Sequence, residues 1–125
     1  MLPIPTPGQH LIADIAGAAR LDDAVWIEST LRDAAAAAGA TVLEVRLHHF
    51  GPRQGVTGVA LLAESHISIH TWPETGMAAI DVFVCGAASD PRAALAVIAE
   101  RLGGTAGNVQ VIARLAAHAH AAVPS

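Results

Sequence analysis

The sequence is poor in the features that support several classes of protein. It has a single cysteine, Cys85, among 125 residues. This excludes an internal disulfide and leaves either a buried apolar thiol or a reactive one. Charged residues make up 14% of the chain, and only seven are Lys or Arg, for a formal net charge of −4. Phosphate binding needs clustered cationic side chains, so we expect no nucleic-acid partner.

Long apolar runs are also missing. No stretch reaches the roughly 18 to 20 apolar residues that a membrane helix needs, and residues 1–10 lack the basic and apolar regions of a signal peptide. We therefore expect a cytoplasmic protein with no membrane partner. Hydrophobic residues nevertheless reach 53% of the chain. That is rich for a small soluble domain, and it favours additional burial in an oligomer.

Periodicity predicts six strands within a single domain, since 125 residues leave room for one core. The strand-like segments are 9–16, 41–49, 56–63, 65–72, 78–85 and 108–115. In the second of these, Leu43, Val45 and Leu47 alternate with polar residues, which is typical of a strand with one wet face. The segment 73–77, "PETGM", predicts a reversal, whereas no obvious turn separates the strands on either side of Glu64.

Two helices are predicted at matching places between the strands. The first lies within 21–40, with Asp22 or Asp23 as N-cap and Gly39 as its stop. The second lies within 89–104, where Ser89 or Asp90 is the N-cap, Pro91 takes the first helical position and Gly103 ends the helix. The order β-α-β-β-β-β-α-β predicts an α+β fold. We expect a two-layer sandwich of a mostly antiparallel sheet with both helices on one face, the other face pairing into a dimer.

The segment 61–74, "LLAESHISIHTWPE", is unusually polar for a strand. Strand alternation places His66, Ser68, His70 and Trp72 on one face. His66 and His70 would lie about 13 Å apart, too far to share a zinc ion, so we predict no metal site there. His118 and His120 near the end of the chain are no better candidates.

His70 and Cys85 have plain structural interpretations when each is taken alone. His70 fits a hydrogen-bonded histidine at a dimer seam, and Cys85 fits a small apolar residue at a strand end. A cysteine protease is excluded, because Cys85 does not lie at a helix N-terminus that would lower its pKa.

Taken together, these residues form a longer motif. The segment 63–86, "AESHISIHTWPETGMAAIDVFVCG", resembles the signature of the prokaryotic S-adenosylmethionine decarboxylase proenzymes, in which ESH is followed by IHTWPE and, after an AA pair, by D-hydrophobic-F-x-CG. The resemblance continues upstream through "HHFGPRQGVTGVALLAESH" and "GQHLIADIAGA" and covers about residues 8 to 115.

The resemblance implies a self-processing enzyme. The chain would cut itself between Glu64 and Ser65 into a beta chain, 1–64, and an alpha chain, 65–125. The Ser65 hydroxyl would attack the Glu64 carbonyl, and elimination and hydrolysis would leave a pyruvoyl group at the new N-terminus. His70 matches the family's processing base, and Thr57 matches a hydroxyl residue that assists the same step.

The resemblance also implies the roles of the mature enzyme. The pyruvoyl group, the only cofactor expected, would form a Schiff base with S-adenosylmethionine and take up the electrons left when carbon dioxide departs. Cys85 matches the proton donor and Glu74 the residue that binds the ribose hydroxyls, while Phe50 and Trp72 offer aromatic faces. The product, decarboxylated S-adenosylmethionine, would serve spermidine synthesis as aminopropyl donor, and the cleaved pairs would assemble as a dimer.

The match departs from the family pattern at three positions and leaves two alternatives. Met77 replaces a usual aromatic, Val84 a common Thr and Ala18 a frequent Cys. One alternative is a pyruvoyl-dependent arginine or ornithine decarboxylase of the same fold, although Trp72 and Glu74 favour the nucleoside substrate. The other is an uncut homologue without catalytic activity.

Overall fold

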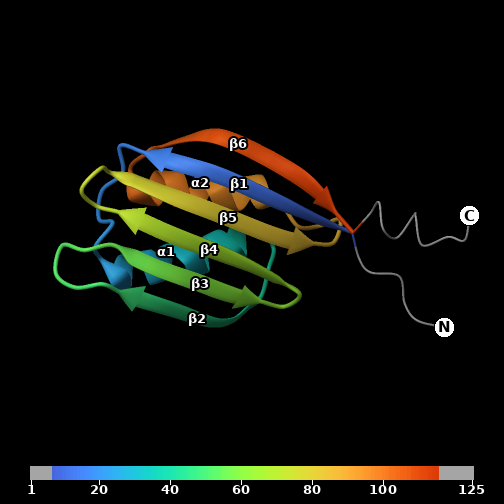
Figure 1. Ribbon diagram of the computed structural model, residues 1–125. Coiled ribbons are helices and arrows are strands. Elements are labelled where there is room, and N and C mark those ends of the chain that lie inside the picture. Colours follow the sequence, from blue (N-terminus) through green and yellow to red (C-terminus); the bar gives the residue numbers. More distant parts are fainter. Residues whose placement is uncertain (1–6, 116–125) are drawn as a thin grey trace, which may run out of the picture.

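The computed structural model describes residues 7–115, so His118 and His120 fall outside it. Six strands form one antiparallel sheet in the order β2-β3-β4-β5-β1-β6 (Figure 1). The elements are β1 (Gly8–Ala16), α1 (Ala24–Ala37), β2 (Val42–His49), β3 (Val56–Leu62), β4 (Ser65–Trp72), β5 (Met77–Cys85), α2 (Pro91–Leu102) and β6 (Thr105–Arg114). The predicted chain order is confirmed.

The molecule has two layers, with both helices behind the sheet in the view of Figure 1. Alternate strand residues point toward the helices and bury their side chains there. Leu11 of β1, Ile69 of β4, Ile27 of α1 and Ile98 of α2 are fully buried in this layer. Removal of such aliphatic side chains from water is the main stabilising term of the fold. The predicted α+β sandwich with two helices on one face is thus confirmed.

Local capping residues set the helix limits at the predicted positions. The Asp23 carboxylate accepts a hydrogen bond from the Trp26 backbone N–H at 3.0 Å and caps α1. This bond, with a second from Arg20, holds the pKa of Asp23 below its ordinary value of 3.8. The second helix is capped by Asp90 and ends at Gly103, which has a left-handed φ of 70°. Neither helix is long and apolar enough to cross a membrane within the described residues.

Two local predictions fail. Leu43 was expected to face the core with Val45 and Leu47, but it is 67% exposed. The reason is a shift in the pairing of β2 with β3 between Val42 and Glu44, which breaks the alternation. The strands on either side of Glu64 were expected to lack a turn, yet they form a tight hairpin. Leu62 pairs with Ser65 across a two-residue turn of Ala63 and Glu64.

Candidate active site

The face of the sheet away from the helices, here called the open face, carries the polar row of β4. Ile67, Ile69 and Thr71 are buried on the helix side, whereas the residues between them are half-buried or exposed. The register aligns the row with its neighbours: His70 lies opposite Thr57 of β3, and Ser68 lies opposite Asp81 of β5. The predicted alternation of β4 is therefore confirmed.

Five of the predicted site residues meet around one cavity at the end of the open face where β4 finishes. This cavity, here called the His70 cavity, has a volume of about 350 Å³. Its lining consists of Phe50, Gln54, Gly55, Thr57, His70, Thr71, Trp72 and Glu74. The loop between β2 and β3, the start of β3 and the end of β4 with its following turn supply these residues. The cavity thus combines aromatic surface, a carboxylate, an imidazole and a hydroxyl.

Within the cavity, Thr57 and His70 are in direct contact. Their strands place them opposite each other, and Thr57 Oγ1 lies 3.3 Å from His70 Nδ1, within hydrogen-bond distance. The ring is exposed and the hydroxyl is half-buried. A hydroxyl bound to one ring nitrogen fixes the orientation of an imidazole, which is what proton transfer by a histidine requires.

The remaining predicted residues lie at the opposite end of the sheet. Ser65 starts β4 directly after the hairpin and is half-buried. Glu64, at the predicted cut, has a φ of 63°, in the left-handed region that a side chain disfavours. Cys85 ends β5 at the same end of the sheet, because His66 pairs with Phe83, two residues before it. The Cys85 carbonyl accepts a hydrogen bond from the hydroxyl of Ser89 at 2.7 Å.

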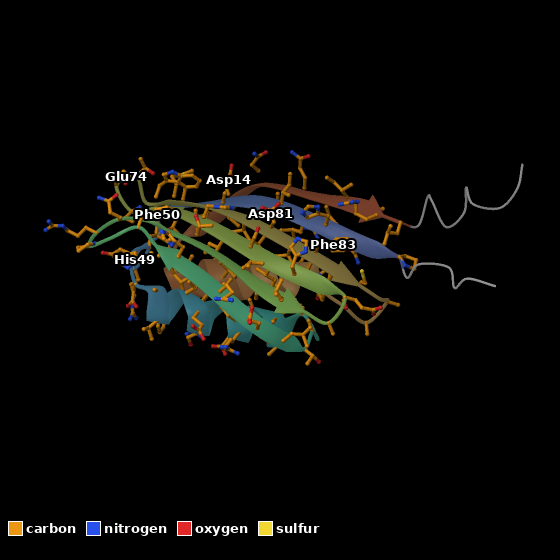
Figure 2. All side chains as sticks on the ribbon, turned by 60° about the horizontal axis from the view of Figure 1, so that its bottom comes forward. Asp14, His49, Phe50, Glu74, Asp81 and Phe83 are labelled. Carbon is orange, nitrogen blue, oxygen red and sulfur yellow. The ribbon has the colours of Figure 1, made fainter. Side chains whose placement is uncertain are left out.

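The two groups of residues are far apart within one chain. Five strand residues at about 3.4 Å each separate Ser65 from His70 by about 17 Å. Figure 2 shows the same division, with Phe50 and Glu74 near one end of the sheet and Phe83 toward the other. One copy of the chain therefore does not bring His70 to Ser65.

A second polar cluster, absent from the sequence-based predictions, lies between the two groups on the open face. The Asp81 carboxylate accepts a hydrogen bond from the Ser68 hydroxyl at 3.2 Å and lies 3.2 Å from His10 Nε2. The His10 ring also packs edge-on against Phe83, with ring centroids 5.9 Å apart. Strand parity could have located this cluster, since His10 and Asp81 occupy open-face positions of β1 and β5.

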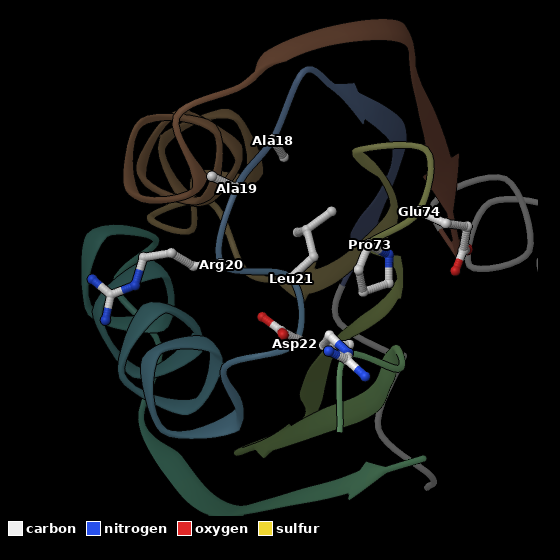
Figure 3. A pocket seen from close by; sticks show the side chains of 8 residues that line it. Ala18, Ala19, Arg20, Leu21, Asp22, Pro73 and Glu74 are labelled. Carbon is white, nitrogen blue, oxygen red and sulfur yellow. The ribbon is translucent and has the colours of Figure 1, made fainter. Parts of the chain in front are cut away.

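Another cavity, of about 370 Å³, lies beyond Glu74. In Figure 3 residues 18–22 line one side of it, and Pro73 and Glu74 line the other. Apart from Glu74, it holds none of the predicted site residues. The His70 cavity is consequently the better candidate for a substrate site.

Comparison with known proteins decides the family. The model of the S-adenosylmethionine decarboxylase family matches residues 9–115. The chain belongs to this family. The S-adenosylmethionine decarboxylase proenzyme of Parasynechococcus marenigrum is 54% identical over 97 residues, covering 76% of this chain and 75% of the relative. That of Methanococcus aeolicus is 50% identical over 97 residues, covering 76% and 82%.

A solved structure of the family supports the fold as well. The crystal structure of the adenosylmethionine decarboxylase from Aquifex aeolicus superposes with a TM-score of 0.73 at 36% identity, covering 87% of this chain and 89% of that one. The predicted resemblance to the S-adenosylmethionine decarboxylase family is confirmed by both comparisons.

The three departures from the family pattern lie in different environments. Val84 is buried in the core, away from the open face. Ala18 lies on the loop after β1, where its N–H donates to the Gly76 carbonyl at 2.9 Å. Met77 pairs with Trp72, which lines the His70 cavity. Met77 therefore lies beside a residue of the candidate substrate site, and Ala18 contacts the turn that carries Glu74.

Proposed function

We propose that the chain is a self-processing, pyruvoyl-dependent decarboxylase of S-adenosylmethionine whose product serves spermidine synthesis. The observation that carries the proposal is the His70 cavity, where five of the residues that match the family motif lie together. The chain itself belongs to that family. In this proposal the chain cuts itself between Glu64 and Ser65 into a beta chain, 1–64, and an alpha chain, 65–125.

The hairpin supports the proposed cut. A non-glycine residue in the left-handed region costs roughly 1 to 2 kcal/mol, so the backbone at Glu64 stores strain directly before the scissile bond. In the proposed reaction the Ser65 hydroxyl attacks the Glu64 carbonyl carbon, the amide C–N bond breaks, and an ester with a free amine results. A base then removes the Ser65 α-proton, and the Glu64 carboxylate leaves. Hydrolysis of the remaining enamine releases ammonia.

The fit of the new group rests on the position of Ser65. The residue is half-buried at a strand end, so the carbonyl made from it would be sheltered and still reachable by substrate. The pyruvoyl group supplies a carbonyl that draws electrons from the substrate α-carbon during decarboxylation. Cys85, at the same end of the sheet, is proposed to deliver a proton to the substrate carbon afterwards.

The distance between Ser65 and His70 within one chain supports a dimer as part of the proposal. His70 lies about 17 Å along β4 from Ser65 of its own chain, beyond the reach of any proton transfer. Two copies could pack through their open faces about a twofold axis that runs across the strands. Such packing would place the His70 end of one copy against the Ser65 end of the other. In this arrangement each site would draw residues from both copies.

The His70 cavity is proposed to hold the adenosyl part of the substrate. The Glu74 carboxylate would accept hydrogen bonds from the ribose hydroxyls. Phe50 and Trp72 are 60% and 47% exposed, which leaves aromatic faces for stacking on adenine or attracting the sulfonium charge. Exposure of two large aromatic rings is costly in water, so a surface of this kind indicates a binding site.

Release of labelled carbon dioxide tests the proposal. Purified protein is incubated with carboxyl-labelled S-adenosylmethionine, arginine or ornithine, and Ser65→Ala protein serves as the inactive control. We expect release from S-adenosylmethionine alone, and none from the variant. Release only from a basic amino acid would reverse the substrate assignment. No release from any of the three by the wild-type chain would favour an uncut homologue without catalytic activity.

A further inference from the structure

We propose that Thr71, buried beneath the His70 cavity, is a positioning residue whose hydroxyl holds the active-site segments in place. The inference rests on the proposed function, because it concerns how the residues of that site are held. Thr71 lies between His70 and Trp72 on β4 but points to the helix side, and it is 6% exposed. It is one of two buried polar side chains in the described residues, the other being Thr30.

The Thr71 hydroxyl joins segments that are distant in sequence. It accepts a hydrogen bond from the Val56 backbone N–H at 2.8 Å and donates one to the Leu21 carbonyl at 2.7 Å. Val56 directly precedes Thr57, so the first bond fixes the entry of β3 beside the Thr57 to His70 contact. The Thr71 side chain thereby adds a bond between the start of β3 and β4, the two strands that bear the proposed processing residues.

The second bond supports the turn that carries Glu74. Leu21 belongs to the loop after β1, and earlier in the same loop Ala18 N–H donates to the carbonyl of Gly76 at 2.9 Å. The loop after β1 is therefore bonded both to Thr71 and to the turn 73–76. Glu74 lies in this turn and lines the His70 cavity. Thr71 therefore contributes to the placement of Glu74 as well as of Thr57.

The chain at the entry of β3 packs closely against the backbone of Thr71. A Cβ added at Gly55 would lie 2.1 Å from the Thr71 carbonyl oxygen. The chain thus enters β3 in direct contact with the backbone of Thr71. Loss of the hydroxyl would leave the Val56 N–H and the Leu21 carbonyl without this partner in a buried place, and the segments would move to regain one.

A merely structural role predicts a different outcome from a positioning role. A core that needed only volume at this position would accept valine, which matches threonine in shape and suits a strand. A positioning role instead depends on the hydroxyl. Serine, which keeps the hydroxyl and loses a methyl group, should then restore function that valine does not.

The experiment compares three variants with wild type: Thr71→Val, Thr71→Ser and Thr30→Val. Thr30→Val is the matched control, since the Thr30 hydroxyl is also buried and donates to the Trp26 carbonyl at 2.8 Å, but on α1. Self-cleavage is followed by intact mass and turnover by kcat/KM with S-adenosylmethionine, at a temperature where circular dichroism shows every variant folded. Displacements near 1 Å can cost about a hundredfold in rate.

We expect Thr71→Val to cleave more slowly and to lose about tenfold to a hundredfold in kcat/KM. Thr71→Ser should stay within about threefold of wild type, and Thr30→Val should keep both rates even if its melting temperature falls equally. Equal turnover of Thr71→Val and wild type, or no rescue by serine, would overturn the inference. The same holds if Thr30→Val loses as much activity as Thr71→Val.

Two further outcomes can be told apart: a Thr71→Val variant that does not fold, and a wild-type chain that is inactive. If Thr71→Val does not fold, Thr71→Cys, which keeps a weaker donor and acceptor of similar size, replaces it. A loss of at least about threefold relative to Thr71→Ser then supports the inference, and equality overturns it. Failure of the wild-type chain to cut itself or to decarboxylate S-adenosylmethionine would instead refute the proposed function. Failure confined to the variants concerns Thr71 alone.

Discussion

Glu64→Gly should slow self-cleavage, although it relieves backbone strain in the hairpin. Glu64 holds a φ of 63° directly before the proposed scissile bond. Glycine adopts this conformation without the side-chain penalty of roughly 1 to 2 kcal/mol. If the strain is released during the cut, a chain that lacks the strain has a barrier to self-cleavage that is higher by the same amount. Since about 1.4 kcal/mol corresponds to a tenfold change in rate, cleavage should slow by about fivefold to thirtyfold.

The assay follows newly made, labelled chains from cell-free synthesis on denaturing gels, so that the uncut chain is visible from the start. Two controls separate strain from other effects. Glu64→Ala removes the carboxylate but keeps the Cβ and its strain, and it should cleave at nearly the wild-type rate. Asn108→Gly relieves a φ of 51° in β6, away from the hairpin, and should leave cleavage unchanged. Cleavage of Glu64→Gly at or above the wild-type rate would refute a role for backbone strain.

Three further predictions test other parts of the structure. Cys85→Ala should leave cleavage intact on gels while slowing decarboxylation by about a hundredfold or more, as expected for loss of a general acid; unchanged turnover would remove Cys85 from the mechanism. Gly55→Ala should destabilise the fold by about 3 kcal/mol or more in denaturant unfolding, because its Cβ would lie 2.1 Å from the backbone oxygen of Thr71; wild-type stability would contradict this packing. Asp23, whose pKa is lowered by the Trp26 N–H and Arg20, should stabilise the fold above pH 3.8 and lose this contribution as the pH falls through its folded pKa. Thermal unfolding across that range should accordingly be less pH-dependent in Asp23→Asn than in wild type, and equal slopes would argue against the cap.

The sequence was sufficient for features that depend on neighbouring residues. The caps at Asp23 and Asp90 and the stop at Gly103 set the helix limits locally, so their positions could be predicted. The exposure of Leu43 could not be, because it results from a pairing irregularity between two strands. The β3–β4 hairpin was missed because neither Ala63 nor Glu64 is a residue that commonly marks a turn.

The candidate site was predictable as a set of residues but not as an arrangement. The motif names Thr57, His70 and Glu74, and the structure gathers them around one cavity. The rise per strand residue argued against a metal ion shared by His66 and His70. The same rise separates His70 from Ser65, although the two residues are close together in the sequence motif. Thr71 escaped notice because one of its partners, Leu21, lies 50 residues away in sequence.

An intact-mass spectrum of the purified protein tests most directly whether the chain converts its own serine into a carbonyl group. The 12.7 kDa chain should be replaced by two pieces, one ending at Glu64. The other should be lighter by one ammonia than a peptide that starts with Ser65, and borohydride should add two hydrogens to it. A single uncut mass after prolonged incubation, or a second piece that begins with unmodified serine, would contradict the proposed enzyme.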